Sequence, residues 1–312
     1  MKRLFKSIIT IASLVILTTS PAMALNTVSP NGITVSPAIE NLIVAPDQNS
    51  VSFTSEVTNN TTQPVNIMLN VNDFASLGQN GGISFYGSNY SSKANPHGLA
   101  YWLHPNIYQF GLNPGKSQSV IATIGSLNLM ARGGHYGALI YDIGAITATG
   151  TRSQIDNNPV VSTLIFLSTA GQGTQTLHLS QPLTSSLYIH PPQSIQFVLA
   201  NIGNTQTTPR GYITEDKGSK EISRGIINSG SGLVLPGSAR LFSVNLKTET
   251  SDFWGGSYRL IIHYRPDSAT FYFNYYKTFY VIGPAWFWLL GIVMILIGVI
   301  LYRRKSRHIY KL

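Results

Sequence analysis

Leu112-Asn-Pro-Gly-Lys-Ser117 is the stretch from which the fold can be predicted, because its pattern recurs as Leu233-Val-Leu-Pro-Gly-Ser238. Pro-Gly supplies the fixed φ and the positive φ that a type II turn needs. A polar turn precedes each copy, Asn60-Thr-Thr-Gln-Pro64 in the first and Asn204-Thr-Gln-Thr-Thr-Pro209 in the second. The two halves of the chain therefore share an order of turns.

A second turn follows the Pro-Gly pair at the same distance in both copies. Arg132-Gly-Gly-His-Tyr136 begins one copy of this turn and Trp254-Gly-Gly-Ser-Tyr258 the other, and 19 positions separate each proline from the first glycine. An equal offset in the same order indicates one structural unit used twice.

The segments between these turns alternate apolar and polar residues as half-buried strands do. The predicted strands are Val51–Val57, Val65–Val71, Ser119–Ile124, Tyr136–Ile143, Val160–Leu167, Leu177–Leu179, Ile195–Leu199, Ala239–Leu246, Tyr258–Tyr264 and Phe271–Val281. Leu127–Met130 predicts only a short helical turn. We therefore expect an all-β protein with two tandem immunoglobulin-like β-sandwich domains, and a single larger jelly roll as the alternative.

The predicted organisation is a signal peptide over 1–24, domain one over 25–172, domain two over 173–281, a transmembrane helix over 283–302 and a basic cytoplasmic tail over 303–312. The domain boundary should fall near Gly171–Thr176. Domain one is about 22 residues longer between the matched turns. The extra residues lie in an insertion over 74–105, and a long loop on a rigid scaffold is a common place for binding residues.

The last apolar stretch runs from Gly283 to Tyr302 without a charge. Twenty residues at ~1.5 Å each span roughly 30 Å, the thickness of a bilayer's hydrocarbon core. Expected anchors at the membrane interface are Trp286, Trp288, Tyr302, Arg303, Arg304 and Lys305. The alternative is a buried core helix. Only Ile282–Pro284 separates the last predicted strand from this helix, so no flexible stalk is expected.

The N-terminus predicts an exported protein. A basic start, a short apolar run over 7–19 and Ala22-Met-Ala24 form a secretory signal peptide with cleavage after Ala24. An uncleaved signal anchor is the alternative. A cleaved signal and one late membrane helix predict a single-pass protein of the cell membrane, with extracellular domains and a cytoplasmic C-terminus.

The charge balance reflects this topology. The chain has 21 Lys and Arg against 12 Asp and Glu, but eight basic residues lie in the signal and the tail. The exported part keeps 13 basic residues against all 12 acidic ones. A nearly neutral surface gives no broad field for nucleic acid, so we expect no nucleic-acid partner. The absence of cysteine points to a bacterial exported protein.

No motif predicts catalysis. The sequence holds no Gly-x-Ser-x-Gly, no His-Glu-x-x-His and no Walker loop, and its histidines lack metal-ligand spacing. Glu215-Asp216 is interpreted as the tip of a hairpin instead of an acid/base pair. We expect no enzyme, no cofactor and no metal, although an extracellular hydrolase remains a further possibility.

A cluster of aromatic residues in the insertion is the candidate ligand platform. It consists of Tyr86, Tyr90, Tyr101, Trp102 and His104. Flat apolar rings with polar tips suit stacking on sugars. The alternative is that Trp102 closes the end of the sandwich core.

The order of these motifs resembles the N-terminal domain of WxL-interacting surface proteins of Gram-positive bacteria. The resemblance rests on Asn59-Asn-Thr-Thr-Gln-Pro-Val65, Ala100-Tyr-Trp-Leu103, Leu112-Asn-Pro-Gly-Lys116 and Arg132-Gly-Gly-His-Tyr-Gly-Ala138. In that family the first domain is associated with peptidoglycan and the second with host or partner binding. The resemblance implies a surface protein that binds cell-wall material.

Two functions follow as expectations. The first is a membrane-anchored extracellular binding or adhesion protein whose domain one contacts a cell-wall glycan or a surface protein. The alternative is a structural or assembly subunit of an envelope complex that pairs with its partner through a sheet edge.

Overall fold

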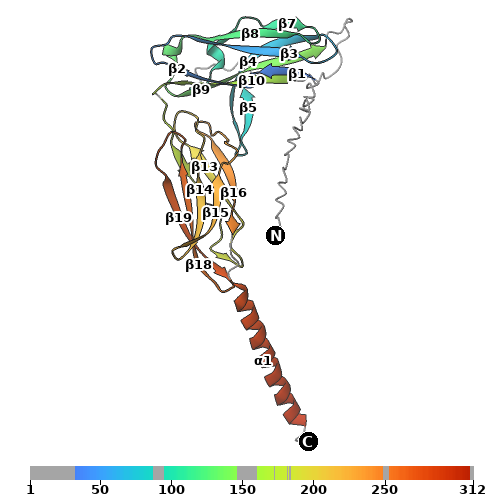
Figure 1. Cartoon of the computed structure of the whole chain (residues 1–312), viewed down its shortest axis with the longest axis vertical. Coiled ribbons are helices and arrows are strands. Elements are labelled where there is room, and N and C mark those ends of the chain that lie inside the picture. Colours follow the sequence, from blue (N-terminus) through green and yellow to red (C-terminus); the bar gives the residue numbers. More distant parts are fainter. Residues whose placement is uncertain are drawn as a thin grey trace, which may run out of the picture.

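The computed structural model describes residues 32–86, 95–145, 160–171, 173–180, 182, 184–248 and 253–309. The predicted signal peptide and its cleavage after Ala24 lie outside these residues. The described chain forms two β-sandwiches and one C-terminal helix (Figure 1). The predicted fold class, two immunoglobulin-like β-sandwiches followed by a helix, is confirmed.

Domain one consists of two sheets. One has the order β1 (Ile33–Ser36), β3 (Val51–Asn59), β8 (Ser117–Ile124) and β6 (Leu103–Pro105). The other has the order β2 (Ile39–Val44), β10 (Val160–Thr169), β9 (Gly134–Ala145), β4 (Val65–Leu77) and β5 (Gly82–Tyr86), and β7 (Gln109–Leu112) also pairs with β4. β2 joins β10 in parallel, while the other pairs are antiparallel.

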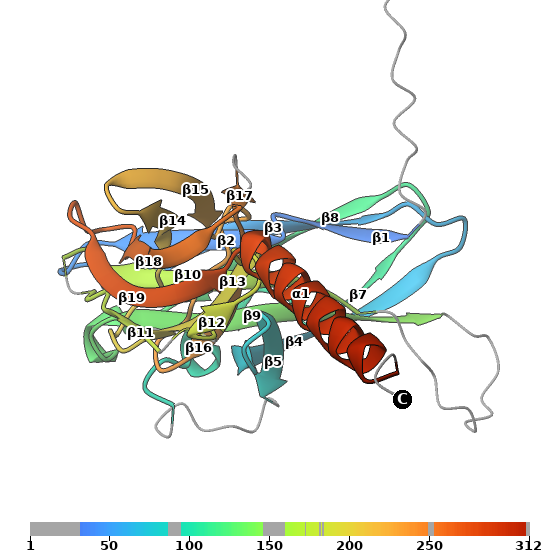
Figure 2. The same cartoon turned by 90° about the horizontal axis from the view of Figure 1, so that it is seen from below.

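Domain two repeats this plan below domain one (Figure 1). A three-stranded sheet has the order β11 (Leu177–Leu179), β13 (Ser194–Asn201) and β16 (Ala239–Asn245). A six-stranded sheet has the order β12 (Leu187–Tyr188), β19 (Phe273–Ile282), β18 (Gly255–Arg265), β14 (Arg210–Lys217), β15 (Lys220–Ile227) and β17 (Lys247–Thr248). Figure 2 shows the two sheets of this domain as facing layers beside the helix.

Period-two alternation builds both cores. In β3, Phe53, Ser55 and Val57 are buried while the residues between them are exposed. The sandwich core of domain one draws its buried residues from Val44 to Leu167, and that of domain two from Leu177 to Val281. Because each strand sends every second side chain inward, the apolar positions of facing sheets meet.

The sequence repeat has a physical counterpart in two buried asparagines at the ends of β3 and β13. The Asn59 side-chain amide donates to the backbone carbonyls of Gln63 and Leu112, at 2.9 Å each. The Asn201 amide donates to the corresponding carbonyls of Thr205 and Val234, at 2.8 and 3.0 Å. Each asparagine thus joins the polar turn to the strand before the Pro-Gly turn, and this explains why the turns recur together.

Within the predicted insertion over 74–105, the described residues 74–86 and 95–105 include regular elements. β4 continues to Leu77 and turns back as β5, a 3-10 turn spans Ala100–Trp102, and β6 follows at once. The β4–β5 hairpin extends from domain one towards domain two (Figure 1). Its regular backbone pairing was hidden by its glycine-rich composition.

The two domains are joined by an apolar cluster and by backbone contacts. Phe74, Tyr136 and Phe166 of domain one pack with Leu235 of domain two. The Gly134 N–H donates to the Asn204 carbonyl at 2.8 Å, and the Tyr136 hydroxyl donates to Gln206 Oε1 at 2.8 Å. The Gly-Gly turn of domain one therefore docks directly on a loop of domain two.

Arg240 closes the junction at the tip of the hairpin. A Cβ placed on Gly81 would lie 2.4 Å from the Arg240 Cζ, and a Cβ on Gly232 would lie 2.5 Å from the same atom. The guanidinium therefore lies between two bare backbones, and it donates to the Leu233 carbonyl at 3.2 Å. A planar cation fits this slot, and a lysine ammonium does not stack in the same way.

Replacing Arg240 by alanine should loosen the hairpin from domain two and lower the free energy of unfolding by about 1–2 kcal/mol, through the lost hydrogen bond and packing. Hydrogen exchange should rise over 77–83 in particular. Arg240→Lys is the matched control: it keeps the charge but loses the planar fit, so it should also loosen the tip. A lysine variant that protects the tip as well as arginine would contradict the stacking explanation.

The C-terminal helix α1 (Pro284–Ile309) follows β19 after the single residue Gly283. It contains a candidate membrane span over Pro284–Arg303, with a mean hydropathy of 2.5 and nearly all of its surface open. Trp286, Trp288 and Tyr302 are exposed on it, as is Arg303. The side chains of Arg304 and Lys305 lie outside the described part of the structure. An isolated apolar helix is typical of a membrane span, because a core helix would be covered by protein.

Candidate functional site

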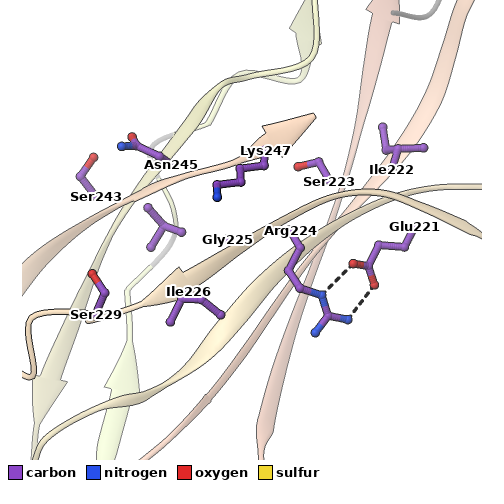
Figure 3. Close-up of a pocket in the computed structure, with 11 residues that line it drawn as sticks. Glu221, Ile222, Ser223, Arg224, Gly225, Ile226, Ser229, Ser243, Asn245 and Lys247 are labelled. Atoms are coloured by element: carbon purple, nitrogen blue, oxygen red, sulfur yellow. Dashed lines mark hydrogen bonds and ion pairs between the residues drawn. The ribbon is translucent and has the colours of Figure 1, made fainter. Parts of the chain in front are cut away.

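Two open sheet edges face one hollow in domain two. β16 is the outer strand of the three-stranded sheet, and β15 is the outer strand of the other sheet beyond its short pairing with β17. Between them lies a hollow of about 690 Å³ lined by Glu221 to Ile226, Ser229, Ser243 to Asn245 and Lys247. Figure 3 shows Ser243 and Asn245 on one side and Arg224 and Ile226 on the other. We call this hollow the edge groove.

The register of β16 places unpaired backbone groups on its outer side. The Leu241 N–H points outward, since it donates to the Gln79 carbonyl of domain one at 2.8 Å. In an antiparallel pair, every second residue directs both backbone groups away from the partner strand. Ser243 therefore also turns its N–H and C=O outward, and the structure gives them no backbone partner within the described chain.

Gly225 holds the two edges close together. A Cβ at this position would lie 2.5 Å from a Val244 methyl carbon and 2.6 Å from the Asn245 carbonyl oxygen. The absence of a side chain therefore brings β15 against β16 at the floor of the groove. Next to it, the Ile226 side chain is 60% exposed. The groove thus offers backbone donors and acceptors beside one apolar side chain.

Charged residues surround the end of the groove at which β17 pairs with β15. Arg224 forms two hydrogen bonds to the Glu221 carboxylate, at 2.7 and 2.8 Å (Figure 3). Lys247 lies where β17 closes the edge of β15. Charged side chains and short end strands are common means of protecting sheet edges. Between the contact of Leu241 with Gln79 and the contact of the Asn245 carbonyl with Gly225, the outward backbone groups of Ser243 face the groove.

The predicted ligand platform is divided by the structure. Tyr86 lies in a hollow of about 310 Å³ at the domain junction, together with His97 and Tyr136. Tyr101 and His104 line another hollow of about 270 Å³, which shares no lining residue with the first. Tyr90 lies outside the described residues. The structure therefore places Tyr86 in one hollow and Tyr101 and His104 in another.

Trp102 packs against the core of domain one, and its ring meets Tyr101 edge-on with centroids 4.9 Å apart. This placement corresponds to the alternative in which Trp102 closes the end of the core. Tyr101 and Tyr108 remain exposed in the smaller hollow, beside Asn70. Two aromatic rings and an amide are chemically suited to a sugar ring or a polar side chain.

The Glu215 side chain is fully buried in β14, contrary to the expected hairpin tip. The hairpin instead turns between Lys217 and Lys220. Both Glu215 carboxylate oxygens and the Ser223 hydroxyl on the neighbouring strand are buried without a hydrogen-bond partner. Burial raises the pKa of Glu215 from 4.5 to about 7, against a smaller lowering effect of Ser223. This carboxyl is enclosed in the protein, so it has no access to a substrate.

Two other buried titratable groups, His135 and Tyr136, follow the Gly-Gly turn of domain one. The His135 ring nitrogens face the carbonyls of Ala131 and Gly98, at 2.8 and 3.2 Å, and burial lowers the pKa of His135. Burial raises the pKa of Tyr136, whose hydroxyl is bound to Gln206. Within the described residues, no three His, Asp or Glu side chains gather as a metal site.

Comparison with known proteins gives a likeness of fold to fimbrial chaperones. The class 5 fimbriae chaperone CfaA matches with a TM-score of 0.44 and 11% identity, over 79% of this chain and 99% of that chain. A chaperone–tip adhesin complex of CFA/I fimbriae biogenesis matches with a TM-score of 0.44 and 13% identity, over 80% and 98%. The E. coli chaperone DraB matches with a TM-score of 0.37 and 8% identity, over 80% and 98%. At these identities the likeness concerns the fold alone.

No family model and no curated protein matches the chain. The resemblance to WxL-interacting proteins is therefore wrong, since the solved structures with a similar fold are fimbrial chaperones. Its motifs were turn motifs: Gly115 and Gly237 have φ of 68° and 67°, and Gly255 has 72°. Any sandwich with such turns needs glycine there, whatever its family.

Proposed function

We propose that this protein is a non-catalytic assembly or binding protein of the cell envelope, which takes up an extended segment of a partner protein in the edge groove. The observation that carries this proposal is the hydrogen bond from the Leu241 N–H to the Gln79 carbonyl. There the outer edge of β16 already pairs with a segment from outside its own sheet. A partner segment would continue that pairing at the backbone of Ser243, with the Asn245 side chain beside it.

The proposed partner is an extended polypeptide instead of a small molecule. Strand addition draws its affinity from backbone hydrogen bonds and its selectivity from alternate side chains. The groove supplies backbone groups for the hydrogen bonds and two side chains for selectivity. These are the exposed apolar Ile226 and the cation Lys247. An apolar residue followed by an acidic one would suit these two positions.

The same proposal includes the topology that the sequence predicts. α1 spans the membrane, the two sandwiches lie on the outer side, and the basic tail remains in the cytoplasm. It is supported by the open apolar surface of α1 and by its direct start after β19. Domain two would then lie next to the bilayer, with the edge groove on its flank.

Crosslinking in cells tests the strand addition. A photoreactive amino acid at Ser243, and separately at Asn245, should capture the same partner. The two crosslinked partner residues should lie two positions apart in one segment, because alternate residues of paired strands are neighbours. Ile43 on the outer strand β2 is the control position, being an exposed residue of another sheet edge. The same partner captured equally from Ile43, or crosslinks without the two-residue spacing, would contradict the proposal.

A single proline substitution gives the second test. Ser243→Pro removes an outward N–H and spares the ladder with β13, so it should abolish the crosslink from Asn245 and leave the melting temperature nearly unchanged. Ser243→Ala is the matched control and should retain the crosslink. Loss of the crosslink in both variants would mean that the hydroxyl, and not the backbone, makes the contact.

A second candidate function is supported by the smaller hollow in domain one. Tyr101 and Tyr108 are exposed there beside His104 and Asn70. This hollow would suit a cell-wall glycan or a surface protein. Binding of the purified exported part to isolated cell wall, lost in Tyr101→Ala with Tyr108→Ala, would support it. Unchanged binding in that variant would contradict this second function.

A further inference from the structure

We propose that the turn Phe253–Trp254 of domain two is a second membrane contact, which inserts its two aromatic side chains into the lipid interface beside the start of α1. The proposal rests on the membrane span proposed above and goes beyond it. It assigns a lipid-binding surface to a β-domain for which the sequence predicted only an extracellular location.

The first argument is the exposure of this turn. Phe253 is 51% exposed and Trp254 is 61% exposed. Their rings meet edge-on with centroids 5.6 Å apart, so the two side chains form one apolar projection. Neighbouring exposed aromatic rings favour transfer out of water, and tryptophan in particular favours the membrane interface.

The second argument is the position of the turn. The Ala285 N–H donates to the Phe253 carbonyl at 3.0 Å, which ties the turn to the first residues of α1. A Cβ on Gly283 would lie 2.3 Å from the Phe253 oxygen and 2.4 Å from the Trp254 carbonyl carbon. The turn is therefore in backbone contact with the beginning of the candidate span. Along α1, the exposed aromatic residues Trp286, Phe287 and Trp288 follow at once.

The third argument comes from the repeat. In domain one, the corresponding turn Arg132–Gly134 docks on domain two through the Gly134 N–H. The same turn of each sandwich thus faces the next part of the molecule. Below domain two that next part is α1 and, with it, the bilayer. The two residues before the glycines are Ala131-Arg132 in domain one and Phe253-Trp254 in domain two. The aromatic pair in domain two suits a lipid partner, where domain one has a protein partner.

The consequence is a fixed orientation of domain two. One helix alone leaves a domain free to tilt about its attachment point. A second contact beside it, with no flexible linker because only Gly283 lies between β19 and α1, restricts that motion. The edge groove would then keep a constant height and direction relative to the membrane.

Single-tryptophan fluorescence of the full chain tests this contact. The chain has four tryptophans, so replacing Trp102, Trp286 and Trp288 by phenylalanine leaves Trp254 alone. The chain is reconstituted in vesicles of phosphatidylcholine and phosphatidylglycerol. Trp254 should be quenched strongly by a nitroxide on the lipid headgroup, and should be severalfold less accessible to aqueous iodide than a control residue.

The control is Tyr276→Trp with all four native tryptophans replaced by phenylalanine. Tyr276 is 59% exposed, similar to Trp254, but it lies six residues before the end of β19. At ~3.3 Å per residue it is roughly 20 Å further from the membrane. Its fluorescence should respond to iodide and not to the lipid nitroxide.

Three outcomes would overturn the proposal. Equal iodide access of Trp254 and the control, in a chain that resists alkaline extraction, would place the turn in water. Protection from iodide without lipid quenching would indicate a protein contact. Release of the chain by alkaline extraction would show that α1 does not span the membrane, and the lipid contact would then have no basis. The crosslinking test of the edge groove would remain valid in that case.

Discussion

Replacing Glu215 by glutamine is expected to raise the free energy of unfolding of domain two by about 2 kcal/mol at pH 8. The carboxyl is fully buried and its oxygens have no hydrogen-bond partner. Ionising it inside the sandwich therefore costs free energy that an uncharged amide does not. A rise of the pKa from 4.5 to about 7 corresponds to about 3 kcal/mol of stability lost when the carboxyl is ionised. Glutamine recovers only part of this, because its buried amide also costs free energy where it lacks a hydrogen-bond partner.

The pH dependence of the wild-type protein follows from the same shift. Below pH 4.5 the carboxyl is protonated in both the folded and the unfolded chain, and its contribution to stability is fully present. Between pH 4.5 and about 7 only the unfolded chain releases the proton, so stability falls as the pH rises. Above about pH 7 both states are ionised and the loss is complete. In Glu215→Gln, this fall should be absent.

Thermal unfolding at pH 4 and at pH 8 measures both effects. Glu221→Gln is the matched control, because Glu221 is exposed and is paired with Arg224 on the same strand, β15. That change should alter stability by only a few tenths of a kcal/mol. A Glu215→Gln protein that keeps the wild-type fall between the two pH values would show that another group causes it.

Glu215 also shows where sequence reasoning failed. Ile213 is buried in the core, so alternation along β14 would place Glu215 on the same inner face. The strand was not predicted, because Glu215, Asp216 and Lys217 look like solvent-exposed residues of a turn. The irregular register between Glu215 and Asp216 also breaks the alternation at that point.

Strands with a clear alternation were predicted well. Each of the ten predicted strands is confirmed, and so is the short turn at Leu127–Leu129. The missed strands are short, rich in glycine or charged: β1, β2, β5, β6, β7, β12, β14, β15 and β17. Their pairing depends on neighbours far away in the sequence, which override local propensity. Local pattern therefore predicted the framework of both sandwiches and not their edges.

The candidate site could not have been predicted for the same reason. Whether Ser243 faces solvent or another strand depends on which strands end each sheet. That order is a property of the whole topology, and no residue type in β16 signals it. Arg240 and Gly81 likewise meet only because the β4–β5 hairpin reaches the second domain. The repeated polar turns over 60–64 and 204–209, by contrast, depend on local sequence, and they could be predicted from it.

Asp73 gives the second large effect. Asp73→Ala should lower the free energy of unfolding by about 3 kcal/mol, because two hydrogen bonds to a carboxylate are lost at a buried site. Asp73 Oδ1 accepts the backbone N–H groups of Leu99 and Ala100, at 2.7 Å each. These bonds begin the 3-10 turn that carries Tyr101 and Trp102. Without them, two backbone donors remain unpaired, one of them in the fully buried Leu99.

Asp73→Asn is the matched control. Its side-chain oxygen can still accept both N–H groups, and its amide nitrogen would replace Oδ2, which has no partner in the buried site. The asparagine variant should therefore differ from the wild type by less than about 1 kcal/mol. Hydrogen exchange at Leu99 and Ala100 should be fast in the alanine variant and slow in the asparagine variant. Equal exchange in the two would mean that packing around Gly98, and not the carboxylate, holds the turn.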